Sequence, residues 1–310
     1  MPNSLVLPQR PAFARSFPKD DGLVAVSTYQ LDQEQSIRDG TICIVKVERN
    51  KDELSLELKD TVKTTAGVFR FEWRNDETVI SALTDGTLSI NRLSDSFKSE
   101  SIPVSSNLLL DVSQSDSSLT GTTDNKGNAY IVDVDTSTVV SMWSAHSLKY
   151  SSDDKCEVWT CALTKDHNLM ATGADDALLK IWDTRSRTAV GHFKVFDAGV
   201  TFVEWTSEDL LLTGSYDEHI RILDRRQPKQ SIKEVKLKGG VWNLEHVMSS
   251  SGQVRTVAAC MYGGYAVVDA DLNVIKENEK AGEQLLYGAT FVDGASEILY
   301  TTFNNYTVAV

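Results

Sequence analysis

The turn at 216–219 gathers the side chains of this sequence that are best suited to chemistry. Tyr216, Glu218 and His219 stand together between two apolar runs. An imidazole titrates near neutral pH and can serve as a general base, and a neighbouring carboxylate can tune it. None of the three is needed to form a turn, so we expect them to contact a substrate or a partner.

The same stretch is one copy of a repeated strand–turn–strand unit. Apolar residues at 210–212 lead into Gly214, Asp217 closes the turn, and the alternating Ile220 and Ile222 form a second strand. Copies recur roughly 40–55 residues apart, which is the spacing of a propeller with four short strands per repeat. The turn-entry positions are Ser27, Ala82, Gly121, Gly173, Gly214, Cys260 and Thr302.

The fourth copy resembles the WD40 repeat. It ends in Trp182-Asp183, and His146 stands upstream where such repeats carry a histidine. The resemblance implies a buried hydrogen-bonded tetrad of His146, Thr172, Asp176 and Trp182. The turn Asp recurs as Asp85, Asp124 and Asp217, whereas the fifth copy has Phe196 in place of the histidine.

The repeats predict an all-β fold, a seven-bladed WD40-type β-propeller that forms one domain over residues 1–310. Since the last repeat stops after its third strand, Asn3–Leu7 is expected to supply the missing outer strand and close the ring. The predicted inner strands are Ala12–Phe17, Val68–Trp73, Asn107–Ser113, Val158–Thr164, Val200–Trp205, Val241–His246 and Ala289–Val292.

Three polar stretches exceed what the repeat needs. They are Gln30–Thr41, Ser94–Ser106 and Ser147–Lys155, and we expect solvated loops, with a partner-binding role as the alternative.

In such a propeller the beginnings of the inner strands and the turns between strands two and three meet at one end of the channel. Loop ends on a rigid scaffold are common sites of binding and catalysis. The candidate residues at this end are His146, Glu157, Trp159, Asp175, Tyr216, Glu218, His219, Gly240, Trp242, Tyr262 and Tyr287.

Composition narrows the function further. The net charge of −13 argues against nucleic acid as a partner, because its binding requires phosphate neutralisation. No leader sequence or apolar run of membrane-spanning length is recognisable, so we expect a cytoplasmic protein with reduced cysteines. The five histidines show no metal-ligand spacing, and neither a metal nor another cofactor is expected.

Enzyme motifs are missing from the sequence. It has no Gly-x-Ser-x-Gly turn, no phosphate-binding Gly-rich loop and no His-Glu-x-x-His pair. From motifs alone, a non-catalytic interaction scaffold is the default reading.

Several segments, however, resemble the WD-repeat diphthine methyl ester hydrolases of the diphthamide pathway. They follow the same order along essentially the whole chain. The segments are Thr28–Leu31, Ala145–His146, Glu157-x-Trp159, Asp175–Asp176, Trp182–Arg185, Gly214–Ile220, Gly239–Trp242, Ala258–Met261 and Tyr287–Ala289.

This resemblance implies hydrolysis of a methyl ester on a modified histidine of translation elongation factor 2. The substrate carries a trimethylammonium group, which aromatic faces and carboxylates bind. The implied binding residues are Trp159, Tyr216, Trp242, Tyr262 and Tyr287, with Gly240, Glu157 and Asp175. Water is the simplest nucleophile, with His219 or His146 as general base beside Glu218, and N–H groups near Gly240 as oxyanion donors.

Structural alternatives stand beside these assignments. The structural assignment makes His146 a tetrad residue, Asp217 a turn residue and Cys260 a small buried hydrophobe rather than a nucleophile, and it is the favoured one for these three. The alternative function is a non-enzymatic WD-repeat adaptor that only binds protein partners. In either case we expect a monomer.

Overall fold

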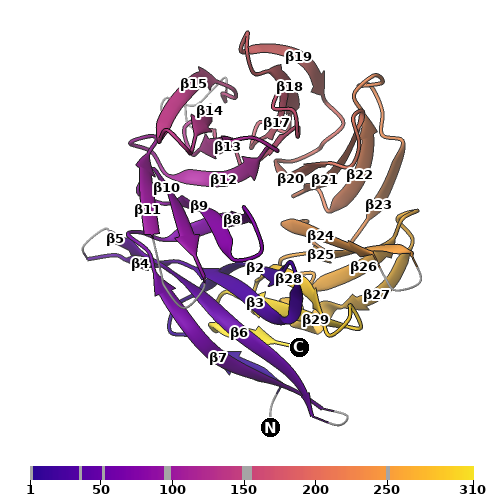
Figure 1. Ribbon diagram of the computed structural model, residues 1–310. Coiled ribbons are helices and arrows are strands. Elements are labelled where there is room, and N and C mark those ends of the chain that lie inside the picture. The colour runs from indigo at the N-terminus through magenta and orange to yellow at the C-terminus, as the bar shows by residue number, and fades with distance from the viewer. Residues whose placement is uncertain (1–2, 35–36, 51–52, 94–98, 149–155, 249–251) are drawn as a thin grey trace.

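The computed structural model describes residues 3–34, 37–50, 53–93, 99–148, 156–248 and 252–310. These residues form seven four-stranded antiparallel sheets arranged as blades in a ring (Figure 1). The seven-bladed propeller is therefore confirmed. One short helix, η1 (Glu279–Gly282), is described, and no described helix is long and apolar enough to cross a membrane.

The strands follow the chain blade by blade, from the channel outwards. They are β2 (Pro11–Phe17), β3 (Asp20–Thr28), β6 (Thr41–Asn50) and β7 (Glu53–Lys63); β8 (Val68–Trp73), β9 (Thr78–Leu83), β10 (Thr87–Arg92) and β11 (Ser99–Pro103); β12 (Leu109–Gln114), β13 (Leu119–Asp124), β14 (Asn128–Asp133) and β15 (Thr138–Ser144); β16 (Thr160–Leu163), β17 (Leu169–Gly173), β18 (Leu179–Asp183) and β19 (Thr188–Phe193); β20 (Val200–Trp205), β21 (Leu210–Ser215), β22 (His219–Asp224) and β23 (Lys233–Lys236); β24 (Asn243–Met248), β25 (Val254–Ala259), β26 (Tyr265–Asp269) and β27 (Val274–Asn278); and β28 (Leu286–Val292), β29 (Glu297–Thr302), β30 (Thr307–Ala309) and β1 (Ser4–Val6).

The ring closes through the first strand, as predicted. Strand β1 pairs antiparallel with β30, with Leu5 opposite Val308. The β6–β7 hairpin reinforces this closure, since Arg49 forms an ion pair with Asp293 at 2.5 Å and Leu54 shares an apolar cluster with the last blade. Figure 1 shows this hairpin extending past the ring beside both termini.

The core lies between blades rather than inside them. Each neighbouring pair of blades shares one apolar cluster. Phe13 and Phe71 belong to the cluster between the first and second blades, and Val24 and Leu299 to the one between the first and last. Both faces of a middle strand are covered, so β9 is buried from Val79 to Leu83 instead of alternating. A blade therefore buries its apolar faces only when its two neighbours are in place.

The long polar stretches are more ordered than expected. The stretch Gln30–Thr41 contains a two-stranded sheet of β4 (Gln30–Asp32) and β5 (Ile37–Asp39), and Ser94–Ser106 contains the outer strand β11. The prediction of plain loops is wrong there, because β11 satisfies the hydrogen bonds of β10. Residues 149–155 of the third stretch lie outside the described residues.

One arginine crosses the channel. Arg70, on β8, is 3% exposed and donates to the main-chain carbonyls of Trp159 (3.2 Å), Thr201 (2.9 Å) and Trp242 (2.9 Å). It also pairs with Asp111 at 3.4 Å. A single guanidinium thus connects the second blade with the third, fourth, fifth and sixth.

Replacing Arg70 by Met should lower the free energy of unfolding by about 3–5 kcal/mol, because a buried carboxylate and three carbonyls lose their donor. Urea unfolding followed by fluorescence measures this change in the free energy of unfolding. The matched control is Arg92→Met, whose exposed ion pair with Glu77 should contribute within about 0.5 kcal/mol. Equal losses of unfolding free energy in the two variants would show that Arg70 stabilises the fold no more than an exposed ion pair does.

Candidate functional site

Aromatic rings meet at the end of the channel where the inner strands begin, here called the mouth. The rings form a closed chain, with neighbouring centroids from 4.9 Å (Trp242 and Tyr287) to 6.0 Å (Phe69 and Trp159) apart, and Tyr216 leans on Trp159 and Trp242. We call this set the aromatic cluster: Tyr29, Phe69, Trp159, Tyr216, Trp242, Tyr287 and Phe303.

A β-bulge at the start of the inner strand explains how such rings reach the channel. The register shifts between Val68 and Arg70, and between Leu286 and Gly288, which leaves Phe69 and Tyr287 as the extra residues. A bulge redirects a side chain away from the two sheet faces. Trp159 and Trp242 hold the same position, directly after a buried valine.

This position is a sequence signal that motif reading missed. In four blades the inner strand starts with, or directly follows, a branched apolar residue and an aromatic one: Val68-Phe69, Val158-Trp159, Val241-Trp242 and Leu286-Tyr287. Aligning these pairs would have added Phe69 to the candidates. Phe303 has no comparable signal, because it enters the cluster from a turn.

Two carboxyls adjoin the aromatic cluster. The indole N–H of Trp159 donates to the carboxylate of Asp175, and Glu157 lies beside it. Desolvation, together with the neighbouring Glu157, raises the pKa of Asp175 to about 6 against the opposing effect of the indole hydrogen bond. The structure therefore brings Glu157, Trp159, Asp175 and Tyr216 together, as the sequence suggested.

Gly240 lies against Tyr216 at this mouth. A Cβ on Gly240 would stand 3.3 Å from Tyr216 Cα and 3.2 Å from Met261 Sδ, so glycine keeps the two segments close. Within the described part of the chain the N–H of Gly240 has no hydrogen-bond acceptor. It is a free main-chain donor beside the aromatic cluster.

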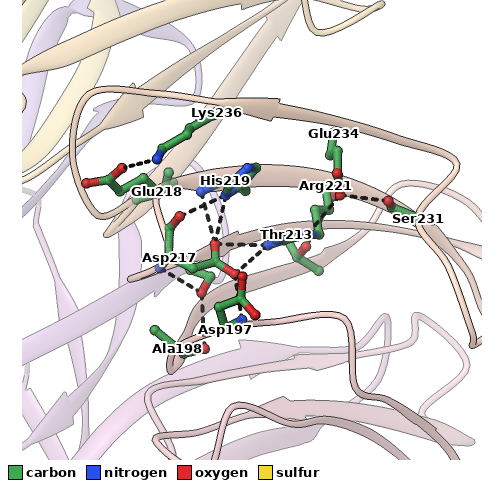
Figure 2. Close-up of polar contacts among 12 residues, drawn as sticks. Asp197, Ala198, Thr213, Asp217, Glu218, His219, Arg221, Ser231, Glu234 and Lys236 are labelled. Carbon is green, nitrogen blue, oxygen red and sulfur yellow. Dashed lines mark hydrogen bonds and ion pairs between the residues drawn. The ribbon is translucent and has the colours of Figure 1, made fainter.

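His219 lies at the start of the third strand of its blade (Figure 2). Its Nδ1–H donates to the carbonyl of Asp217 at 2.8 Å, so Nε2 carries the lone pair, and no described group donates to it. Asp217 is itself fixed by Arg221 at 2.9 Å. No described hydrogen bond or ring contact joins His219 to the aromatic cluster.

Arg221 explains why this blade has no tetrad histidine. Its guanidinium lies 5.1 Å from the ring centre of Phe196 and binds both Asp217 and, at 3.2 Å, Glu234. A cation stacked on a ring thus replaces the imidazole as partner of the turn Asp.

Two other candidates lie outside the cluster. Glu218 forms an ion pair with Lys236 at 3.2 Å on the surface (Figure 2). Tyr262 is 65% exposed and, among the described ring contacts, touches none of the aromatic cluster.

The predicted tetrad is present in the fourth blade. His146 Nδ1 donates to Asp176 at 2.9 Å, the Thr172 hydroxyl lies 2.8 Å from His146 Nε2, and the Trp182 indole donates to that hydroxyl at 2.8 Å. His146 is 2% exposed, and burial lowers its pKa, which keeps it neutral. Both ring nitrogens are in use, so we correct the catalytic assignment of His146 to a structural one.

The Cys260 thiol is not an activated nucleophile. It is 1% exposed, and desolvation raises its pKa to about 12. A reactive thiolate requires a lowered pKa and access to solvent.

Comparison with known proteins supports the fold and the resemblance. A model described as "WD domain, G-beta repeat" matches residues 138–183. A chain from a crystal structure of a mitotic checkpoint complex superimposes over 99% of this chain and 89% of its own, with a TM-score of 0.70 and 15% identity, which speaks for the fold alone.

Several curated relatives share one name. Diphthine methyltransferase of Schizosaccharomyces pombe is 24% identical over 84% of this chain and 82% of that protein. The mouse protein of the same name is 31% identical over 54% of this chain, and the human one 30% over 48%. The aligned parts cover only 36% and 33% of the mouse and human proteins. The resemblance inferred from the sequence is thereby confirmed, although the name of these relatives states methyl transfer rather than ester hydrolysis.

The raised pKa of Asp175 predicts a pH-dependent stability. A carboxyl whose pKa rises from 3.8 to about 6 on folding stabilises the fold below pH 4, and this contribution is lost as the pH rises to 6. Asp175→Asn, which mimics the protonated acid, should therefore be more stable than the wild type by about 1 kcal/mol at pH 7.5 and gain nothing at pH 4.5.

Urea unfolding at the two pH values tests this. The control is Asp166→Asn, because hydrogen bonds lower the pKa of Asp166 and the sign reverses: this variant should lose stability at pH 7.5. An Asp175→Asn protein that is less stable than the wild type at pH 7.5 would contradict the electrostatic description of the mouth.

Proposed function

We propose that the protein acts in diphthamide biosynthesis and hydrolyses the methyl ester of diphthine methyl ester on translation elongation factor 2. The observation that carries this proposal is the convergence of the aromatic cluster with the carboxyl pair Glu157 and Asp175 at one mouth. Aromatic faces with adjacent carboxylates bind a quaternary ammonium group. The name of the relatives supports the choice of a diphthine substrate.

In the proposed binding mode the trimethylammonium group lies on the outward faces of Trp159 and Tyr216, next to Glu157. Both rings are partly exposed, whereas Trp242 is buried beneath them. The ester is attached to the same carbon as the ammonium, so its carbonyl also lies near Asp175 and Gly240.

Asp175 is the proposed general base. Its pKa of about 6 leaves it mostly ionised at neutral pH yet basic enough to accept a proton from water. The water oxygen attacks the ester carbonyl while the proton passes to Asp175, and the N–H of Gly240 donates to the oxyanion. Collapse breaks the carbon–methoxy bond, and the methoxy oxygen takes the proton back from Asp175 to leave as methanol. The carboxylic acid that remains loses its proton to solvent and becomes a carboxylate.

His219 is the alternative base, because Nδ1 contacts the Asp217 carbonyl and no described group contacts Nε2. Its position on β22, without a contact to the aromatic cluster, makes Asp175 the better-supported residue. If His219 acted, the substrate would have to extend from the mouth over the turn at 216–219.

The activity is tested with elongation factor 2 that carries the methylated intermediate. Ester hydrolysis removes the mass of one methylene and releases methanol without any methyl donor. Methyl transfer, which the relatives' name suggests, would instead require a donor and add mass. A stable complex with no change in mass would support the non-catalytic adaptor.

The base is tested by variants. Asp175→Asn should lower kcat by about 10²–10⁴-fold, and the wild-type kcat/KM should rise with pH through about 6 as Asp175 ionises. Glu208→Gln, an exposed carboxyl between β20 and β21, is the matched control and should retain full activity. Loss of activity in His219→Gln with an active Asp175→Asn protein would transfer the role to His219.

A further inference from the structure

A second polar site lies in the channel, at the end opposite the aromatic cluster. A cavity of about 350 Å³ is lined by the later residues of the inner strands, among them Gln114, Leu163 and Trp205. Arg70 also lines it, while its guanidinium binds the carbonyls of two mouth residues. The arginine therefore separates the mouth from this cavity, and the proposed function makes no use of the latter.

Carboxyls are concentrated around Arg15, which lines the cavity. Arg15 faces four of them, Glu72, Glu204, Glu245 and Asp111, and forms an ion pair with Glu72 at 3.5 Å. The other cations are already engaged or peripheral. Arg70 is held by carbonyls and Asp111, His246 pairs with Glu204 at 3.4 Å, and Lys165 is an exposed residue at the rim.

Unpartnered polar atoms point to a missing occupant. Asn243 lines the cavity and is 1% exposed, yet neither its amide oxygen nor its amide nitrogen has a partner among the described residues. Glu245 does not itself line the cavity but faces Arg15, and its Oε2 is also without a partner among the described residues, although its other oxygen accepts from Thr290 at 2.8 Å. Buried polar groups of this kind are normally satisfied.

We propose that this cavity is a binding site for a small organic cation of the guanidinium or amine type. Glu72 and Glu204 present carboxylates that remain 36% and 37% accessible from the channel, and the amide oxygen of Asn243 adds a neutral acceptor. The described carboxyls do not form a group that could hold a metal ion, which favours an organic cation. Its planar or branched N–H groups would satisfy acceptors on several blades at once.

Binding of a cation in this cavity should depend on the protonation of Glu72 and Glu245. Desolvation, with the neighbouring carboxyls Glu204 and Asp111, raises the pKa of Glu72 to about 7 against the opposing field of Arg15. Desolvation also raises the pKa of Glu245 to about 7, against Arg15, Thr290 and His246. A bound cation favours the ionised carboxyls, so binding should release protons near pH 7 and strengthen by about tenfold between pH 6 and pH 8.

Calorimetric titration of the full chain with methylguanidinium tests the site, with methylurea as the neutral analogue and acetate as the anion. Saturable one-to-one binding of methylguanidinium alone, with protons released when buffers of different ionisation enthalpy are compared, is the expected result. Binding that is equally weak for all three probes would mean that the cavity holds only water and would overturn the proposal. Preference for acetate would also overturn it.

A variant locates the binding. Glu72→Gln should weaken methylguanidinium by at least about tenfold and reduce the pH dependence. The control is Glu77→Gln, an exposed carboxyl that pairs with Arg92 and should leave binding unchanged. Equal affinity of both variants would contradict the site, and the comparison of the three probes on the wild type needs no variant to fold.

Discussion

The propeller depends on a single charge at its centre. The inner strands of three blades begin by directing main-chain carbonyls at the channel axis, where they would face one another without donors. The Arg70 guanidinium lies among these carbonyls and binds those of Trp159, Thr201 and Trp242. A buried arginine is stable there only because its charge is also compensated by Asp111.

This arrangement divides the channel into two chemically different ends. On one side the rings of the mouth rest on Arg70, whose guanidinium lies 5.2 Å from the ring centre of Trp242. On the other side Glu72, Glu204 and Asp111 face a polar cavity. Part of the chain's excess of acidic residues therefore lies inside the channel rather than on the outer surface.

The fold could be predicted almost completely from the sequence because its signals are local and repeated. Turn residues such as Asp85 and Asp217 accept hydrogen bonds from the N–H two residues on, so they mark the same turn in each copy. The site could be predicted only in part. Trp159 and Asp175 could be predicted because they belong to one repeat. The partners of Arg70 lie on four other blades, and no sequence spacing encodes such contacts.

His146 and His219 illustrate the same limit. In the sequence both are histidines beside a turn, and the difference lies in what their ring nitrogens meet. Those of His146 are both occupied by the tetrad, whereas His219 uses only Nδ1, which lies 2.8 Å from the carbonyl oxygen of Asp217 and 3.4 Å from its carboxylate. The contacts of the two ring nitrogens, which the sequence does not show, thus decide whether an imidazole is structural.

The bulge at the start of the inner strands has a consequence for how such a protein diversifies. Phe69 and Tyr287 are extra residues that pair with nothing on the neighbouring strand, while the buried Val68 and Leu286 before them keep the register. Substitutions at the bulge change what the mouth recognises without shifting any strand. Descendants of such a chain can therefore acquire new ligands by point mutation while inheriting the same ring.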